Sequence, residues 1–270
     1  MKMIYEKISL DKNEEDVYLE AYVPDTLKDF VKDAILVIPG GGYDCVCYDR
    51  EGEPIALEFV GRGMAAFVLH YSVREKARFP RPLIQASKAM KYIKDNSERY
   101  MINPERVFAT GFSAGGHLCT SLGTLWHMKE IYDEVPMEEG YNRPRGIIPV
   151  YPVVSLNVPT HERSFMNILG TTDFSGENKH RFSLDDHVDE RSAPACIIHT
   201  SDDAVVPVFN ALALANAYAK AKRQFELHVF KTAPHGMALA NEITACGNPE
   251  WNNPANAKWT SLAYAWMKSI

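Results

Sequence analysis

The chain has 270 residues, of which 46% are hydrophobic, and its formal net charge is −6. A chain of this length can bury a substantial core as one domain or two, so length alone does not decide the domain count. The chain is acidic overall and has no cluster of basic residues suited to binding a phosphate backbone, so we expect no nucleic acid partner. No apolar run approaches the length of a membrane span, and we expect no membrane partner.

The N-terminus and the cysteines favour a cytoplasmic protein. The first residues, Met-Lys-Met-Ile-Tyr-Glu-Lys, lack the apolar stretch and the small-residue cleavage site of a signal peptide. Five cysteines are scattered along the chain, without the spacing of a disulfide framework. Cys45 and Cys47 are separated by one residue, which is the wrong spacing for a zinc knuckle. We therefore expect free thiols in a reducing compartment and no bound metal.

Apolar runs alternate with helical patterns along the chain. Residues 17–23 alternate like a strand with one buried face, whereas residues 34–38 and 64–69 are continuously apolar, like strands buried on both faces. Further strands are predicted at 107–110, 146–151, 195–199 and 225–230, and helices at 54–60, 82–93, 118–126, 207–220 and 259–267. This order predicts a mostly parallel sheet with helices on both faces, in a single α/β domain over residues 1–270.

One long stretch, residues 152–194, lies between two predicted core strands and shows no regular pattern. Connections of this length are usually functional or disordered. Its apolar residues, among them Phe165, Ile168 and Phe182, are too many for a disordered linker. We therefore interpret residues 152–194 as a cap insertion over the site and not as a second domain.

Ser113 lies in the sequence Gly-Phe-Ser-Ala-Gly-Gly, at the predicted junction of a strand and a helix. At such a junction a sharp turn lifts a serine hydroxyl above the sheet. Glycines are needed at 111 and 115 because a Cβ there would collide with the neighbouring strand or helix. The alternative is an ordinary glycine-rich turn. An acid and a base farther along the chain favour the interpretation of Ser113 as a nucleophile.

Three consecutive glycines, Gly40 to Gly42, follow the strand predicted at 34–38. Consecutive glycines weaken regular structure and let the backbone approach another group closely. In acyl transfer that group is a carbonyl oxygen, which needs two or three convergent N–H donors. A phosphate-binding loop is the rival interpretation, but neither Gly-x-Gly-x-x-Gly spacing nor a Gly-Lys-Ser/Thr sequence is present.

The chain contains nine histidines, and their places relative to Ser113 and to the acid indicate which one is the base. A serine nucleophile needs a histidine to accept its proton and a carboxylate to orient that histidine. In α/β-hydrolases these residues follow one another in the order Ser, Asp or Glu, His. His235 lies just after the last predicted strand and fits this order, whereas His199 precedes the acid. His117, a turn into the helix after Ser113, is interpreted as a hydrogen-bonded packing residue that points back toward the sheet.

Two candidates for the acid, Asp202 and Asp203, follow the strand predicted at 195–199. The segment 200–207 resembles the α/β-hydrolase pattern Gly-x-x-Asp-x-x-Val-Pro, and that alignment makes Asp203 the acid. Thr200 stands where the pattern has its glycine. Asp202 remains the alternative, and we expect it to serve the turn.

Over residues 35–237 the chain resembles α/β-hydrolase esterases, in particular acetyl-xylan esterases and other small carbohydrate-ester hydrolases. The resemblance is carried by Pro-Gly-Gly-Gly-Tyr at 39–43, Tyr-Ser-Val at 71–73, Phe-Pro-Arg-Pro at 79–82, Gly-Phe-Ser-Ala-Gly-Gly-His at 111–117, and the Asp203 and His235 segments. It implies the α/β-hydrolase fold and an oxyanion hole built from the amides of Gly41, Gly42 and Ala114. Pro39 stands where the lipase loop has histidine.

The same resemblance implies a serine esterase that hydrolyses small acyl esters, acetyl esters above all, of sugars or related alcohols. The reaction passes through an acyl-enzyme and needs no metal or organic cofactor. The expected partner is the small-molecule ester; the oligomeric state stays open, a homo-oligomer included. Three alternatives remain because fold and function separate easily. They are an amidase or formamidase, a peptidase of the same fold, and a non-catalytic ligand-binding homologue.

Overall fold

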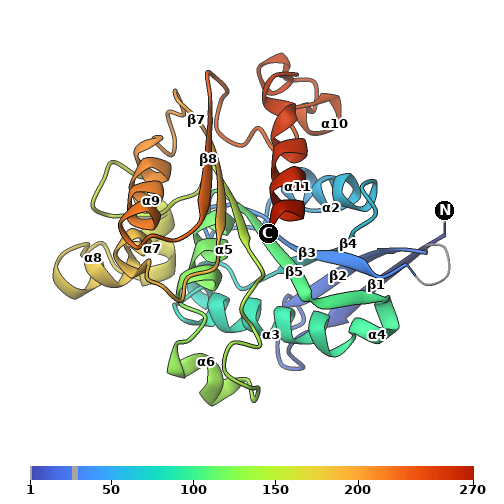
Figure 1. Cartoon of the computed structure of the whole chain (residues 1–270). Helices are drawn as coiled ribbons and strands as arrows, with labels where there is room; N and C mark the ends of the chain where they lie inside the picture. The colour runs from blue at the N-terminus through green and yellow to red at the C-terminus, as the bar shows by residue number, and fades with distance from the viewer. Residues whose placement is uncertain (1, 26–29) are drawn as a thin grey trace.

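A computed structural model describes residues 2–25 and 30–270 (Figure 1). Within these residues, eight strands form one sheet in the order β1-β2-β4-β3-β5-β6-β7-β8. Their bounds are β1 (Met3–Ser9), β2 (Tyr18–Pro24), β3 (Lys32–Ile38), β4 (Ala65–His70), β5 (Ile102–Phe112), β6 (Ile147–Val150), β7 (Ala195–Thr200) and β8 (Phe225–Phe230). From β4 to β8 all neighbours pair in parallel, and the pairs β1–β2 and β2–β4 are antiparallel. The predicted mostly parallel sheet is confirmed.

Helices cover both faces of this sheet. Their bounds are α1 (Tyr48–Glu51), α2 (Glu53–Val60), α3 (Arg81–Asp95), α4 (Ser97–Tyr100), α5 (Ala114–Thr124), α6 (Lys129–Glu134), α7 (Glu162–Leu169), α8 (Gly176–Phe182), α9 (Phe209–Lys220), α10 (Glu242–Ala245) and α11 (Trp259–Ser269). The buried side chains of α3, α5 and α9 belong to the core on one face, and those of α2 and α11 to the core on the other (Figure 1).

The continuously apolar strands divide their side chains between the two cores. In β3, Leu36 and Ile38 pack with α3 and α5, whereas Ile35 and Val37 pack on the side of α2 and α11. All four are fully buried. Such burial contributes roughly 1.5–3 kcal/mol per side chain, which is why a central strand of a doubly covered sheet lacks a polar face.

The elements that differ from prediction have weak apolar patterns. The edge strand β1 was not predicted, because Met3, Ile4 and Tyr5 are 40–57% exposed and show no buried alternation. Helix α5 begins at Ala114 and not at the predicted residue 118, because Ala-Gly-Gly at its start carries no helical periodicity.

The fold brings the loops after β3, β5, β7 and β8 to one edge of the sheet. These strands are parallel, so their carboxyl ends point the same way and the loops converge there. Ligand sites of parallel sheets lie at this edge. None of the helices in the described part of the chain combines the length and the apolar character needed to cross a membrane.

Candidate active site

Ser113 occupies a tight turn between β5 and α5, at the carboxyl edge of the sheet. Its φ is 53° and its ψ −117°, a conformation that costs a non-glycine residue on the order of 1–3 kcal/mol. Glycines make the turn possible. A Cβ on Gly111 would overlap the carbonyl group of Gly115, and a Cβ on Gly115 would overlap that of Ile38. The structure thus places Ser113 at the predicted strand-to-helix junction, for the steric reason expected.

His235 lies between Ser113 and Asp203. Its Nε2 is 2.8 Å from Ser113 Oγ, and its Nδ1 is 2.7 Å from Asp203 Oδ2. The other carboxylate oxygen of Asp203 accepts hydrogen bonds from the amides of Val205 and Val206, both at 2.9 Å. One hydrogen-bonded chain therefore runs from the serine hydroxyl to a buried carboxylate.

The electrostatics of this chain set the proton positions. Burial alone raises the pKa of Asp203, but the hydrogen bond and charge of His235 and the amides of Val206 and Val205 outweigh it, and the pKa lies below its usual value. The carboxylate stays ionised at neutral pH and accepts the Nδ1 proton. His235 Nε2 is then free to accept the proton of Ser113.

The neighbouring acid and histidine bind other groups. Asp202 accepts hydrogen bonds from the hydroxyl of Thr232 at 2.6 Å and the amide of Ala233 at 3.2 Å, which ties the loop after β7 to the loop after β8. His199 is buried, and its Nε2 donates to the carbonyl oxygen of Val206 at 2.9 Å. Burial lowers the pKa of His199, so this ring is neutral.

The loop after β3 carries two left-handed glycines, Gly41 with φ 121° and Gly42 with φ 64°. The carbonyl oxygen of Gly41 accepts hydrogen bonds from the amides of Asp44 and Cys45, which close the turn. Over residues 2–25 and 30–270, no protein acceptor is bound by the amides of Gly41, Gly42 or Ala114. Amides without a partner beside a nucleophile are what an oxyanion hole requires.

A cavity of about 180 Å³ joins these groups. Gly41, Gly42, Ser113 and His235 line it, so two of the three predicted donor residues face one space with the predicted nucleophile and base. Its walls also include Arg50, Glu51, His161 and Val205. A space of this size fits a short acyl group better than a long one.

We expect Gly41→Ala to lower kcat for an ester about 100-fold. The alanine keeps its N–H but displaces it, and this is the order of loss when one oxyanion donor is removed. A Cβ at this position would overlap the carbonyl group of Cys45, and alanine disfavours a φ of 121°. Steady-state kinetics and thermal unfolding of the same samples measure the effect. Gly63→Ala is the matched control, because φ is 84° there and the nearest atom to its Cβ would be 4.0 Å away. Equal kcat in both variants would contradict the prediction.

His117 is a buried packing residue, as predicted. Its Nδ1 shares a hydrogen bond with the hydroxyl of Tyr43 at 2.9 Å, and its ring lies edge-on to Phe165 with centroids 5.5 Å apart. Burial lowers the pKa of His117 to about 4, so the ring is neutral. The expected direction was wrong, because the ring faces the glycine loop and α7 and not the sheet.

Residues 152–194 contain α7, α8 and a further helical turn at Leu184–His187, so this stretch is more regular than predicted. The helices are short, and their apolar positions are too few to show a period. The stretch contacts the glycine loop: Asn167 Nδ2 donates to the carbonyl oxygen of Gly42 at 2.8 Å. Arg163 also lies 3.3 Å from the carboxylate of Asp44.

Two buried polar residues beside the site, Glu51 and Tyr151, were missed from the sequence. Glu51 ends the run Asp49-Arg50-Glu51, and a run of charges is typical of a solvated face. Tyr151 stands at the end of a predicted strand, where an aromatic residue needs no special explanation. No motif marks either residue.

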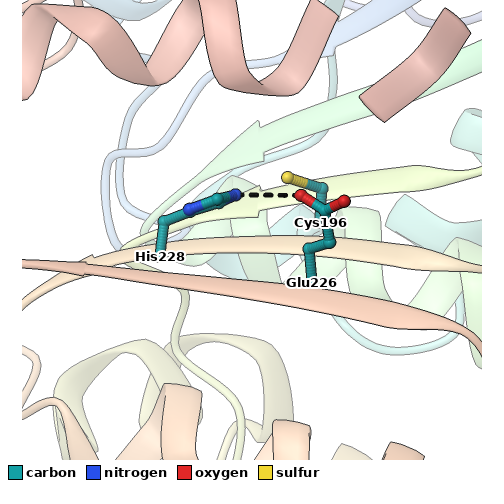
Figure 2. Close-up of side chains that lie close together, drawn as sticks. All are labelled: Cys196, Glu226 and His228. Atoms are coloured by element: carbon teal, nitrogen blue, oxygen red, sulfur yellow. Dashed lines mark hydrogen bonds and ion pairs between the residues drawn. The ribbon is translucent and has the colours of Figure 1, made fainter. Parts of the chain in front are cut away.

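One group of side chains in the described part of the chain could hold a metal ion: Cys196 of β7 with Glu226 and His228 of β8 (Figure 2). Their ligand atoms lie within 4.8 Å of one another, and His228 Nε2 is 3.1 Å from Glu226. Burial and the charge of Glu226 raise the pKa of the Cys196 thiol, whereas metals bind the thiolate. This group lies along the strands and not among the loops around Ser113.

A family model and the similar curated proteins agree on the kind of protein that this chain resembles. A family model described as BD-FAE matches residues 19–218. The chain is 38% identical over 218 residues to endo-1,4-beta-xylanase B of Butyrivibrio fibrisolvens, and 30% identical over 213 residues to an acetylxylan esterase of Xylanibacter ruminicola. These alignments cover 79% and 76% of this chain, but 34% and 41% of the relatives. The chain thus spans less than half the length of these curated relatives.

Solved structures resemble the whole chain. An acetyl ester-xyloside bifunctional hydrolase from Caldicellulosiruptor lactoaceticus matches with a TM-score of 0.84 at 33% identity, over 98% of this chain and 96% of that one. MGS-M1, an alpha/beta hydrolase enzyme from a Medee basin deep-sea metagenome library, matches with a TM-score of 0.80 at 33% identity, over 99% and 97%. The predicted fold class is therefore confirmed.

Proposed function

Because this chain belongs to the BD-FAE family and is an α/β-hydrolase of the esterase type, we propose that it is a serine carboxylic-ester hydrolase. It acts through an acyl-enzyme on small acyl esters, acetyl esters above all, of sugars or related alcohols. The observation that carries the proposal is the hydrogen-bonded chain from Ser113 through His235 to Asp203, beside a small cavity and unpaired amides.

Acylation uses the groups that face this cavity. Ser113 Oγ attacks the carbonyl carbon of the ester while its proton moves to His235 Nε2. The carbonyl electron pair becomes an oxyanion, which accepts hydrogen bonds from the amides of the glycine loop and of Ala114. The bond to the alcohol oxygen then breaks, the alcohol takes the proton from His235, and the acyl group stays on Ser113.

Deacylation repeats these steps with water as the nucleophile. Water gives a proton to His235 and attacks the acyl-enzyme carbonyl. Collapse of the second tetrahedral intermediate breaks the bond to Ser113 Oγ, which regains the proton, and the acid leaves. Asp203 keeps the imidazole oriented and stabilises its positive charge in both halves of the reaction.

The cavity beside Ser113 supports a small acyl group. The cavity at Ser113 measures about 180 Å³, and His161, at the start of α7, forms part of its wall. Asn167 of α7 also holds the carbonyl oxygen of Gly42 at 2.8 Å. On this proposal, residues 1–270 form one hydrolase domain with 152–194 as its cap insertion. The similarity to an acetylxylan esterase and to an acetyl ester-xyloside hydrolase supports acetyl as the group removed.

Acetate release from acetylated xylo-oligosaccharides tests the proposal. We expect the wild type to release acetate and to cleave acetyl esters faster than butyryl and longer acyl esters. A matched acetanilide series separates an esterase from an amidase, and we expect esters to react faster. Brisk cleavage of long acyl esters without detectable acetate release would contradict the proposal. Failure of a fluorophosphonate probe to label the wild type would favour a non-catalytic binding protein.

A further inference from the structure

A buried carboxyl group lies beside the glycine loop, in the wall of the cavity at Ser113. Glu51, the last residue of α1, is 3% exposed, and each of its carboxyl oxygens accepts a hydrogen bond at 2.8 Å. One bond comes from the amide of Gly40, the first glycine of the loop, and the other from the hydroxyl of Tyr151. One side chain thus joins two segments at the carboxyl edge of the sheet.

The bond to Gly40 leads to the proposed oxyanion donors. Gly40 lies between the carboxyl and the end of β5, since a Cβ there would be 2.7 Å from Glu51 and 2.7 Å from the carbonyl oxygen of Phe112. No side chain can separate the loop from Glu51. Because peptide groups are planar and joined at Cα, fixing the amide of Gly40 restricts where the amide of Gly41 can lie.

The bond to Tyr151 leads to the loop of the proposed base. The Tyr151 hydroxyl accepts a hydrogen bond from the amide of Ala238 at 3.1 Å, in the loop that carries His235. The Tyr151 ring also lies edge-on to the imidazole, with centroids 5.0 Å apart. Glu51 is therefore linked through one hydroxyl to the segment that orients His235.

Burying a carboxyl group in this place has a desolvation cost. Burial raises the pKa of Glu51, although hydrogen bonds from Tyr151 and Gly40 and the nearby His235 and Arg50 side chains oppose that rise. A methionine would fill similar space without the cost of burying a carboxyl group. It would, however, leave the amide of Gly40 and the hydroxyl of Tyr151 without this acceptor. Holding these two groups is what the carboxyl adds over an apolar side chain.

We propose that Glu51 is a positioning residue for the hydrolysis reaction. Through Gly40 it fixes the amides that receive the oxyanion, and through Tyr151 it fixes the loop of the base. The inference rests on the proposed ester hydrolysis. It requires that loss of the two hydrogen bonds slow the chemical step while leaving substrate affinity nearly unchanged.

Three substitutions of Glu51 test this role. Glu51→Asp is one methylene too short to reach both partners, and Glu51→Met has no oxygen acceptor. Glu51→Gln keeps the length; its carbonyl oxygen can accept from Gly40 while its amide donates to Tyr151. We measure kcat and KM on an acetyl ester, the rate of fluorophosphonate labelling, and thermal unfolding.

We expect kcat and the labelling rate to fall together, roughly 100-fold, in Glu51→Asp and Glu51→Met, the scale for loss of an oxyanion donor. KM should stay within about threefold, because ground-state binding is not what is removed. Glu51→Gln should keep kcat within about tenfold of the wild type, because one acceptor and one donor replace two acceptors.

Glu20→Met is the matched control. Glu20 is also buried, at 8% exposure, and accepts hydrogen bonds from the hydroxyls of Tyr5 and Tyr22, within β1 and β2. We expect this variant to lose thermal stability and to keep wild-type kcat. The comparison separates the loss of a buried carboxyl as such from the loss of positioning.

Wild-type kcat and labelling in Glu51→Asp or Glu51→Met would overturn the inference. If the methionine variant does not fold, the aspartate variant decides alone. A Glu51→Gln variant as slow as Glu51→Asp would also overturn it, because the charge and not the pair of hydrogen bonds would then matter. A wild type without ester turnover or labelling refutes the proposed function first, and with it the premise of this inference.

Discussion

Ser113→Ala is expected to lower kcat for an acetyl ester by about a millionfold, the scale for removing a serine that acts together with a histidine. Without the hydroxyl no acyl-enzyme forms, and water must attack the ester directly. The glycine-loop amides and the cavity remain, so a residual rate of about 10³–10⁴ over the uncatalysed reaction should persist. Initial rates at high enzyme concentration, together with fluorophosphonate labelling, measure both quantities.

Alanine is a fair replacement at this position because it leaves the backbone as it is. Both residues carry a Cβ, so the strain of a φ of 53° is the same in the variant and the wild type. Thermal unfolding should therefore be nearly unchanged. Turnover comparable to that of the wild type, in a sample free of wild-type enzyme, would show that another residue is the nucleophile.

Asp203→Asn is expected to lower kcat by about 10⁴-fold, the loss seen when the orienting acid becomes an amide. The amides of Val205 and Val206 both donate to one oxygen, so the asparagine carbonyl must stay there. Its NH₂ group then faces Nδ1 of His235. That contact favours the tautomer protonated on Nε2, which cannot accept the serine proton. The pH–rate profile and kcat measure the change.

Asp202→Asn is the control for this variant. Asp202 holds Thr232 and Ala233, and an asparagine oxygen can still accept one of those two hydrogen bonds. We expect kcat within about tenfold of the wild type, because the imidazole keeps its acid. The reverse outcome, with an active Asp203→Asn and an inactive Asp202→Asn, would assign the acid to Asp202.

The sequence could predict the central part of the fold because burial on both faces leaves a simple pattern. Strands such as β3 and β4 contain continuous apolar runs, and a short run of this kind is typical of a strand buried on both faces. The edge strand β1 could not be found this way, because its side chains are mostly exposed and it is placed by backbone pairing with β2, which leaves no apolar pattern. The helices of 152–194 were missed because they are too short to show a helical period.

Ser113, Asp203 and His235 could be placed at one edge from the sequence because each lies in the segment that follows a parallel strand. Parallel strands carry their following loops to one edge, so chain order and a local motif suffice. Glu51 and Tyr151 are a hundred residues apart, and their contact depends on the order of the strands across the sheet. Local sequence patterns do not predict the order of strands in the sheet. Neither residue could therefore be placed beside the site from the sequence.

The hydrogen bond from Asn167 to Gly42 has a practical consequence for changing what this protein acts on. The glycine loop is held by Glu51 on one side and by Asn167, within residues 152–194, on the other, so both determine its shape. A segment transplanted from a relative in place of residues 152–194 would bring its own contact to this loop, or none. Such chimaeras should be compared by kcat as well as by selectivity. A new segment at 152–194 would change the position of the glycine loop as well as the residues around the cavity.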